Sequence, residues 1–241
     1  MCSGRVDPVM VADAFVAGAD GVLVGACKRG ECHYSTGNLQ AEAKLGLARR
    51  VLALAGVRPE RLVMRWMSSA EGNKFAEYAT AFQGEMAALG PLGTAGAGGA
   101  GDAGEAPDAA ETGEAAGGRR TDLALRLRAA RKALGGRKLR WVAGKIVEFT
   151  EKGNLYGERF TAHEIGRLCD EIAADEFRLR EILERIAAGP KSVRELASAM
   201  GVAPRVILRQ VADLRRMGLA KVAAVEGRSP QWVAQEGTEY R

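Results

Sequence analysis

The chain of 241 residues lacks any run of about 18 uncharged apolar residues, the length that a membrane-spanning helix needs. Its first residues also lack the basic, apolar and small-residue regions of a secretory signal peptide. We therefore expect a cytoplasmic protein. Four cysteines are present, at positions 2, 27, 32 and 169. Without an export signal, disulfides are a poor first hypothesis, and clustered cysteines favour metal or redox chemistry.

Two common kinds of active site are also missing. Ser68 and Ser69 have no histidine or acid placed to activate either hydroxyl as a nucleophile. The glycines of 96–104 follow no strand and precede no Lys-Ser or Lys-Thr pair, so they do not form a phosphate-binding loop. The sequence therefore gives no support for a serine nucleophile at 68–69 or for a phosphate-binding loop at 96–104.

Charge and composition divide the chain. Lys and Arg number 10 against 9 Asp and Glu in residues 1–89, none against 5 in 90–118, and 25 against 16 in 119–241. The middle stretch is almost entirely Gly, Ala, Pro, Asp, Glu and Thr. Such a composition buries too little apolar surface to offset the entropy of ordering. We predict a flexible acidic linker at 90–118 between two folded parts.

Helix and strand patterns alternate in residues 1–89, the first predicted domain. The expected order is a helix capped by Asp7-Pro8, a strand at 21–26, a helix at 38–56 capped by Asn38, a strand at 61–67, and a helix at 68–89 opened by a Ser68 to Glu71 capping box. This order implies a small parallel α/β sheet with flanking helices. Because Met1-Cys2 stands where a strand should feed the first helix, we expect that an N-terminal strand is missing.

The second part is helical and basic. Helices are expected at 121–134 and 138–152, and a Thr161 to Glu164 capping box opens another at 161–175, which gives a helical region at 119–175. Residues 176–241 then read as three helices, at 176–189, 192–200 and 205–218, followed by a two-stranded hairpin. That order is the layout of a winged helix.

The third of these helices and the hairpin are rich in cations. Arg205, Arg209, Arg215 and Arg216 stand against Asp213, and Lys221 and Arg228 lie in the hairpin. Cations in this arrangement suit phosphate contact. The same arrangement also serves as a protein-docking module, and a basic helix face is often merely solvated. Both interpretations stay open.

Cys2, Cys27 and Cys32 share a position in the predicted sheet. Cys27 follows the strand 21–26 directly, and Cys2 precedes the first helix, so all three thiols should converge at the carboxyl edge where ligands bind. Thiolates bind zinc and iron–sulfur clusters, for which four ligands are usual. A metal site, a redox thiol pair and inert loop cysteines are the alternatives. His33 is a fourth-ligand candidate or a packing residue.

Other residues are expected to pack. Cys169 has helical spacing with Ile165, Leu168 and Ile172, which is typical of a core thiol. The aromatic side chains expected in the core are Trp66, Phe75, Tyr78, Phe82, Trp141 and Trp232.

Three segments carry a resemblance to a known family: "CSGRVDP" (2–8), "AFVAGADGVLVGACKRGECHYSTGN" (14–38) and "RPERLVMRWMSSAEGNKFAE" (58–77). In unbroken order over about residues 1–85, they closely resemble the delta, or iron–sulfur, subunit of the methyl-viologen-reducing hydrogenase associated with heterodisulfide reductase. The resemblance implies a 2Fe-2S cluster with Cys2, Cys27 and Cys32 as candidate ligands. It also implies electron transfer from a hydrogenase or formate dehydrogenase to the flavin-containing A-type component of heterodisulfide reductase.

Two departures from the family pattern matter. Lys28 and Arg29 replace a His-Pro pair, and their charge should favour the thiolate form and a higher reduction potential. The family also begins with a strand and a C-x-x-C pair upstream of the position of Met1. We therefore hypothesise that this chain starts at an internal methionine and that further cluster ligands precede it.

The resulting prediction is a non-catalytic electron-transfer subunit of an oxidoreductase complex. The alternative is a redox- or metal-responsive winged-helix transcriptional regulator. A long flexible linker transmits reorientation poorly, which favours the first prediction over the second.

Overall fold

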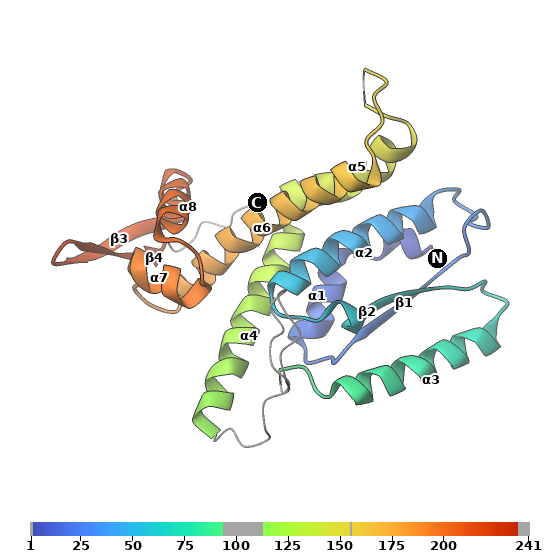
Figure 1. Ribbon diagram of the computed structural model, residues 1–241, viewed down its shortest axis with the longest axis horizontal. Coiled ribbons are helices and arrows are strands. Elements are labelled where there is room, and N and C mark those ends of the chain that lie inside the picture. Colours follow the sequence, from blue (N-terminus) through green and yellow to red (C-terminus); the bar gives the residue numbers. More distant parts are fainter. Residues whose placement is uncertain (1, 94–112, 155, 236–241) are drawn as a thin grey trace.

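The computed structural model describes residues 2–93, 113–154 and 156–235, and for 113–116 it describes the backbone alone. The protein is mixed α/β and mostly helical, with two small sheets (Figure 1). In chain order the elements are η1 Ser3–Arg5, α1 Pro8–Val16, β1 Val22–Ala26, α2 Gly37–Leu54, η2 Pro59–Arg61, β2 Leu62–Trp66, α3 Gly72–Leu89, α4 Gly113–Gly135, α5 Arg137–Glu151, α6 Ala162–Ala187, α7 Val193–Met200, α8 Pro204–Arg216, β3 Ala220–Glu226 and β4 Ser229–Ala234.

The first sheet is the predicted parallel pair. Strands β1 and β2 run in register from Val22 opposite Leu62 to Ala26 opposite Trp66. Helices α1 and α2 lie on one side of the sheet and α3 on the other (Figure 1). The predicted α/β order of residues 1–89 is therefore confirmed.

Local sequence signals explain where several helices begin. The Asp7 carboxylate accepts a hydrogen bond from the Val9 backbone N–H, and Pro8 occupies the first turn of α1. The predicted capping boxes of Thr161 with Glu164 and of Ser192 with Glu195 both form. The prediction of two separate helices at 161–175 and 176–189 is wrong, because the structure has one continuous helix, α6, over both segments.

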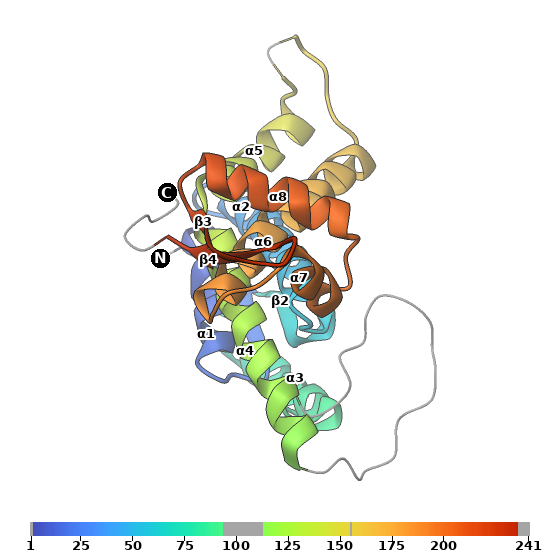
Figure 2. The same cartoon turned by 90° about the vertical axis from the view of Figure 1, so that its left-hand side faces the viewer.

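The main hydrophobic core crosses the predicted linker. It joins residues of α1 and α2, such as Phe15 and Leu47, to residues of the later helices, such as Leu134, Leu139 and Phe177. Figures 1 and 2 show α4 running beside α1, with α5 and α6 over α2. The predicted helical region 119–175 thus packs against the predicted first domain within one core.

Part of the predicted linker is helical. Helix α4 begins at Gly113, so the last residues of the stretch 90–118 belong to it, contrary to the prediction. Residues 94–112 lie outside the described ranges, and the linker stays a prediction there.

Of the six aromatic residues predicted as core, two are exposed and three more, Trp66, Tyr78 and Phe82, are only half-buried. Helix α3 has no buried residue, and Phe75 is 57% exposed. Trp141 on α5 is 60% exposed. Helical spacing finds an apolar face but does not say whether another element covers it. Trp232 on β4 is buried, as predicted.

The C-terminal elements have a second core of their own. Ile186 of α6, Leu196 of α7, Ile207 and Leu214 of α8, and Trp232 of β4 pack together. Strands β3 and β4 form an antiparallel hairpin, and the unit projects from one end of α6 (left in Figure 1). The three helices and the hairpin follow one another in the predicted order.

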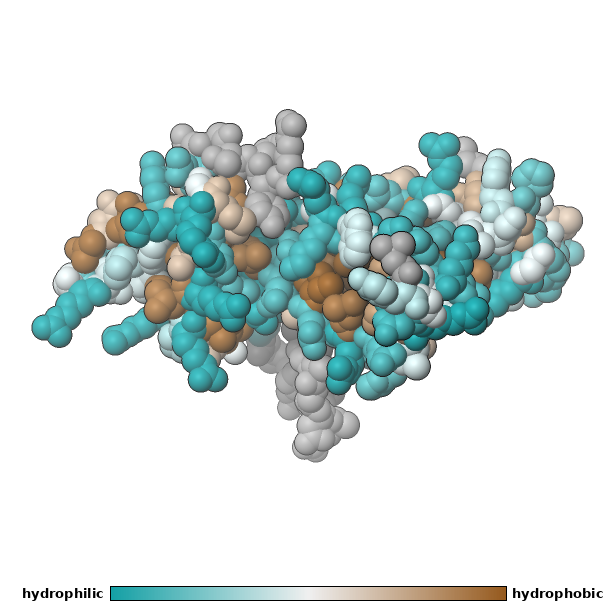
Figure 3. Space-filling view, turned by 90° about the horizontal axis from the view of Figure 1, so that it is seen from above, coloured by the Kyte–Doolittle hydropathy of each residue, from teal (hydrophilic) through white to brown (hydrophobic). Residues whose placement is uncertain are grey.

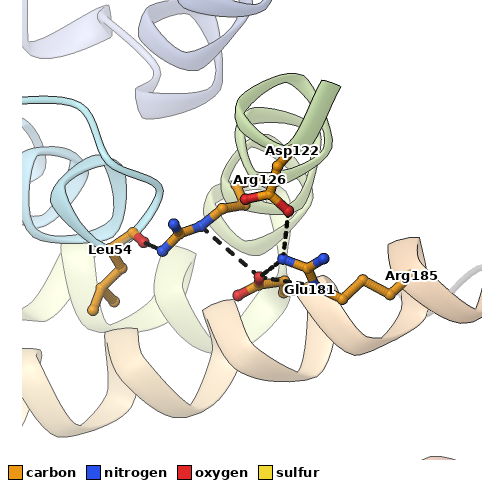
Figure 4. A network of polar contacts seen from close by, with 5 residues as sticks. All are labelled: Leu54, Asp122, Arg126, Glu181 and Arg185. Atoms are coloured by element: carbon orange, nitrogen blue, oxygen red, sulfur yellow. Dashed lines mark hydrogen bonds and ion pairs between the residues drawn. The ribbon is translucent and has the colours of Figure 1, made fainter. Parts of the chain in front are cut away.

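A network of partly buried charges joins α4 to α6 near the boundary of the two cores (Figure 4). The Arg185 guanidinium donates to Glu181 Oε1 at 2.6 Å and to Asp122 Oδ1 at 2.8 Å. The Arg126 guanidinium lies 3.8 Å from the same Glu181 oxygen and donates to the Leu54 carbonyl at the end of α2. Three helices are thus tied together through one buried carboxylate.

No helix in the described part of the chain is both long and apolar enough to cross a membrane.

Candidate thiol site at the carboxyl edge of the parallel sheet

Three segments meet beyond the carboxyl ends of β1 and β2. They are η1 with Cys2 before it, the loop 27–36 that follows β1, and the loop 67–71 that follows β2. In parallel sheets, ligands bind at this edge. The topology therefore places the predicted cysteines where a cofactor is expected.

The thiols of Cys2 and Cys32 are neighbours although thirty residues separate them in sequence. Their Sγ atoms lie 3.8 Å apart, and both cysteines are free. Two sulfurs bonded at about 2.3 Å to one tetrahedral metal stand about 3.8 Å apart. The pair therefore fits two ligands of a single metal ion.

Gly37 lets the two thiols approach the backbone of α2. A Cβ atom at this position would lie 2.3 Å from Cys2 Sγ and 3.2 Å from Cys32 Sγ. Any larger residue would therefore push the sulfurs away. The spacing of the thiols depends on a glycine that the sequence analysis did not single out.

The environment of Cys32 favours its thiolate. Burial raises the pKa of this thiol, but hydrogen bonds from the backbone of Tyr34, Asn38 and Gly37 and from the Cys2 side chain outweigh it, so the pKa is lowered. A lowered thiol pKa favours metal binding, because the thiolate is the ligand.

Asn38 holds the cysteine loop. Its side chain, only 1% exposed, donates to the carbonyls of Cys27 and Lys28 at 3.0 and 2.9 Å. The predicted helix cap at Asn38 is wrong, because α2 begins at Gly37 and its N-cap is Thr36. From the sequence, an asparagine just after a cysteine loop could either cap the following helix or hold the loop by hydrogen bonds, and only the tertiary contacts distinguish these two roles.

Cys27 lies at the same edge but makes no thiol contact with the pair. It lines an open hollow of about 420 Å³ together with Ser3, Ser68, Glu71 and Phe75. Within the described ranges, no three Cys, His, Asp or Glu side chains stand close enough to hold a metal ion together. The structure thus brings two of the three predicted ligands into contact.

Glu71 ties the cysteine loop to the loop after β2. Its carboxylate accepts from Lys28 Nζ and Lys74 Nζ, both at 2.7 Å, and from the Ser68 N–H at 2.8 Å. The hydrogen bonds from Lys28, then Lys74, then Ser68 lower the pKa of Glu71 to about 2. The predicted helix start at Ser68 is wrong, because 68–71 is a turn and α3 begins at Gly72.

The two cations of the cysteine loop are both engaged by acids. Lys28 pairs with Glu71, and Arg29 pairs with Glu42 and lies over the Trp66 ring. Neither is among the causes that lower the pKa of Cys32, which are backbone and thiol hydrogen bonds. The expected charge effect on this thiol is therefore replaced by a hydrogen-bond effect.

The remaining candidates are Cys169 and His33. Cys169 is 2% exposed in the core, and burial raises the pKa of its thiol, which confirms the prediction of a packed cysteine. His33 is exposed, and its ring contacts Tyr34 edge-on.

The protein is thus a parallel α/β protein with a candidate thiol site at the carboxyl edge of its sheet, where one of the two neighbouring cysteines has a lowered pKa. Residues 1–90 match the family described as "Methyl-viologen-reducing hydrogenase, delta subunit". The chain belongs to this family, as the sequence resemblance indicated.

The relatives include iron–sulfur subunits of two F420-non-reducing hydrogenases. The one from Archaeoglobus profundus is 46% identical over 90 residues, which are 37% of this chain and 66% of the relative. The corresponding vhu iron–sulfur subunit of Methanocaldococcus jannaschii is 39% identical over 90 residues, 37% of this chain and 67% of the relative.

A third relative belongs to a different enzyme. It is the A-type component of the ferredoxin:CoB-CoM heterodisulfide reductase of Methanosarcina mazei, 41% identical over 91 residues, which are 38% of this chain and 12% of the relative. This chain thus spans about two thirds of the length of the Archaeoglobus relative and an eighth of the Methanosarcina one.

Proposed function

We propose that this protein is a non-catalytic electron-transfer subunit of an oxidoreductase complex and that Cys2, Cys27 and Cys32 are ligands of a 2Fe-2S cluster. The observation that carries the proposal is the 3.8 Å approach of Cys2 Sγ and Cys32 Sγ at the sheet edge. When bound, such a cluster accepts and releases one electron. Relatives named as hydrogenase iron–sulfur subunits support this proposal.

The chain's own residues would position the ligands. Gly37 leaves room for Cys2 and Cys32, backbone N–H groups favour the Cys32 thiolate, and Asn38 fixes the carbonyl of Cys27. Cys27 completes the proposed set because it stands five residues before Cys32 in the same loop. Any remaining ligands would come from outside the described residues.

The proposed partners follow from the names of the relatives. The acceptor is the A-type component of a heterodisulfide reductase, and the donors are components of a hydrogenase. The flavin of the acceptor and a formate dehydrogenase as the other donor are proposed from the sequence resemblance alone. We place this exchange in the cytoplasm. We also propose that residues 176–241 are a winged-helix domain, because three helices and a hairpin with their own core follow in that order.

Iron and acid-labile sulfide analysis of anaerobically prepared protein tests the proposal. We expect iron and sulfide in equal amounts in the wild-type chain, and their loss in Cys2→Ser and Cys32→Ser. The matched control is Cys169→Ser, because this thiol is buried in the core away from the sheet edge. The proposal would be rejected if the Cys32→Ser variant retained its iron, or if the wild-type chain contained no iron.

A further inference from the structure

The C-terminal unit is basic. Residues 188–235 contain eight Lys and Arg against three Asp and Glu, an excess as large as the net charge of +5 of the whole chain. Such an imbalance on a small unit attracts polyanions. The unit lies beyond residues 1–90, which carry the family match.

The cations of α8 share one exposed face. Arg205, Arg209 and Arg216 stand four and seven residues apart, and Arg215 borders the same face. The opposite face, with Ile207, Val211 and Leu214, is buried in the second core. Packing therefore fixes the arginines outward, and Figure 3 shows hydrophilic side chains projecting at this end of the molecule.

The acids of residues 188–235 pair with only one arginine of this face, Arg216. Asp213 pairs with Arg216, the Glu195 carboxylate caps α7, and Glu226 accepts from the Gln231 side chain. No acid within the described part of the chain forms an ion pair with the remaining arginines of α8, which are Arg205, Arg209 and Arg215.

The hairpin beside α8 extends the basic surface. Strand β3 packs against α8, and its residues after Ala220 are exposed, including Lys221, while Arg228 lies in the turn. The register shifts between Val222 and Ala224, and a bulge with a lysine is a usual way to blunt an edge strand. Addition of a partner strand is therefore disfavoured here.

We infer that the exposed face of α8 and the β3–β4 hairpin bind duplex DNA through its phosphates. An exposed helix of this width enters a major groove, and the flanking cations can reach the backbone on either side. The cations of this unit are spread over both α8 and the hairpin. The evenly spaced phosphates of duplex DNA match such a spread better than the scattered acidic side chains of a partner protein do. This inference does not depend on a cluster at the thiol site.

Fluorescence anisotropy with the full chain tests this inference. The probe is a labelled mixed-sequence duplex of about 20 base pairs, two helical turns, titrated between about 50 and 200 mM salt. We expect binding that weakens with salt. The variant Arg205→Ala/Arg209→Ala/Arg215→Ala should bind at least about tenfold more weakly, with a log–log salt slope smaller by about 1 per lost phosphate contact.

The control variant is Lys152→Ala/Arg159→Ala/Arg167→Ala, which removes the same charge from exposed positions at the α5–α6 end. It should bind DNA like the wild type, and unchanged thermal melting of both variants shows that they fold. No binding at low salt, or equal weakening in both variants, would overturn the inference. So would tighter binding of labelled poly-glutamate than of DNA, which would indicate an acidic protein partner.

Discussion

Asn38 is the residue on which the shape of the cysteine loop depends most. Its side chain donates hydrogen bonds to the carbonyls of Cys27 and Lys28, and the Lys28 carbonyl also accepts from the Glu31 N–H within the loop. A buried polar contact of this kind is expensive to lose, because the Cys27 carbonyl is left without the donor it has in the wild type. Asn38 thus links the start of α2 to the position of a proposed ligand.

We therefore expect Asn38→Ala to lower the free energy of unfolding by about 1–3 kcal/mol and to speed the reaction of the Cys27 thiol with a disulfide reagent. Urea denaturation and thiol titration measure the two effects. Asn73→Ala, the same change at an exposed position on α3, should alter neither. An unchanged reaction rate in Asn38→Ala would mean that Asn38 does not position the loop.

Glu71 gives the site a defined pH dependence. Its pKa is about 2 in the folded protein, against an ordinary value of 4.5. A depressed carboxyl pKa stabilises the fold fully above the unfolded value, and the contribution is lost as the pH falls from about 4.5 to about 2. The Glu71→Gln variant should melt lower than wild type at pH 6, and the gap should close by about pH 2.

Thermal melting at several pH values checks this expectation. Glu77→Gln, at an exposed position on α3, should show no such gap. A gap that stays constant from pH 6 to pH 2 would mean that the Glu71 carboxylate is not held in the ion pairs with Lys28 and Lys74.

At the level of the elements, the sequence signals that succeeded are local ones. Asp7-Pro8 and the capping boxes at Thr161 and Ser192 depend on residues within four positions, and all three form. The pattern of Ser68 and Glu71 looks the same, and the Glu71 carboxylate does accept from the Ser68 N–H, but residues 68–71 form a turn and α3 begins only at Gly72. Lys28, forty-three residues away, binds the other carboxylate oxygen, a contact that local spacing does not indicate.

The candidate site likewise has features that the sequence predicts and features that only the tertiary structure reveals. Topology predicted that Cys2, Cys27 and Cys32 converge at the sheet edge, because strand order determines that edge. Cys2 and Cys32 meet there, whereas Cys27 lies at the same edge without contacting them. The roles of Gly37 and Asn38 depend on atomic contacts across η1, α2 and the loop, which no local pattern indicates. The exposure of Phe75 and Trp141 likewise depends on what covers each helix.

The buried carboxylate of Glu181 lies at the centre of one charged network between α4 and α6. Its side chain is 5% exposed, and it faces two guanidinium groups. Removing one member of a buried ion pair leaves the others uncompensated, at a cost of about 3–5 kcal/mol. We expect Glu181→Ala to lower the free energy of unfolding by that amount, measured by urea denaturation.

Glu171→Ala is the matched control, since Glu171 is an exposed acid on the same helix. It should change stability by no more than about 0.5 kcal/mol. Equal effects of the two variants would mean that the network contributes nothing beyond ordinary helix charge.

For the whole molecule, the main core makes residues 1–93 dependent on the later helices. Leu47 of α2 and Phe15 of α1 are buried in the same core as Leu134 and Leu139. A fragment ending at residue 93 should therefore lack a cooperative thermal transition in circular dichroism, and addition of fragment 113–241 should restore one. A cooperative transition in the isolated fragment 1–93 would show that it is an independent domain.

The central claim is that the thiol site holds an iron–sulfur cluster rather than a redox thiol pair, and a reductive titration followed by electron paramagnetic resonance separates the two. A cluster predicts a paramagnetic signal that rises over a one-electron curve, about 59 mV per tenfold change, and is absent in Cys32→Ser. A two-electron curve of about 30 mV per tenfold change without a signal would contradict the claim and identify a dithiol pair.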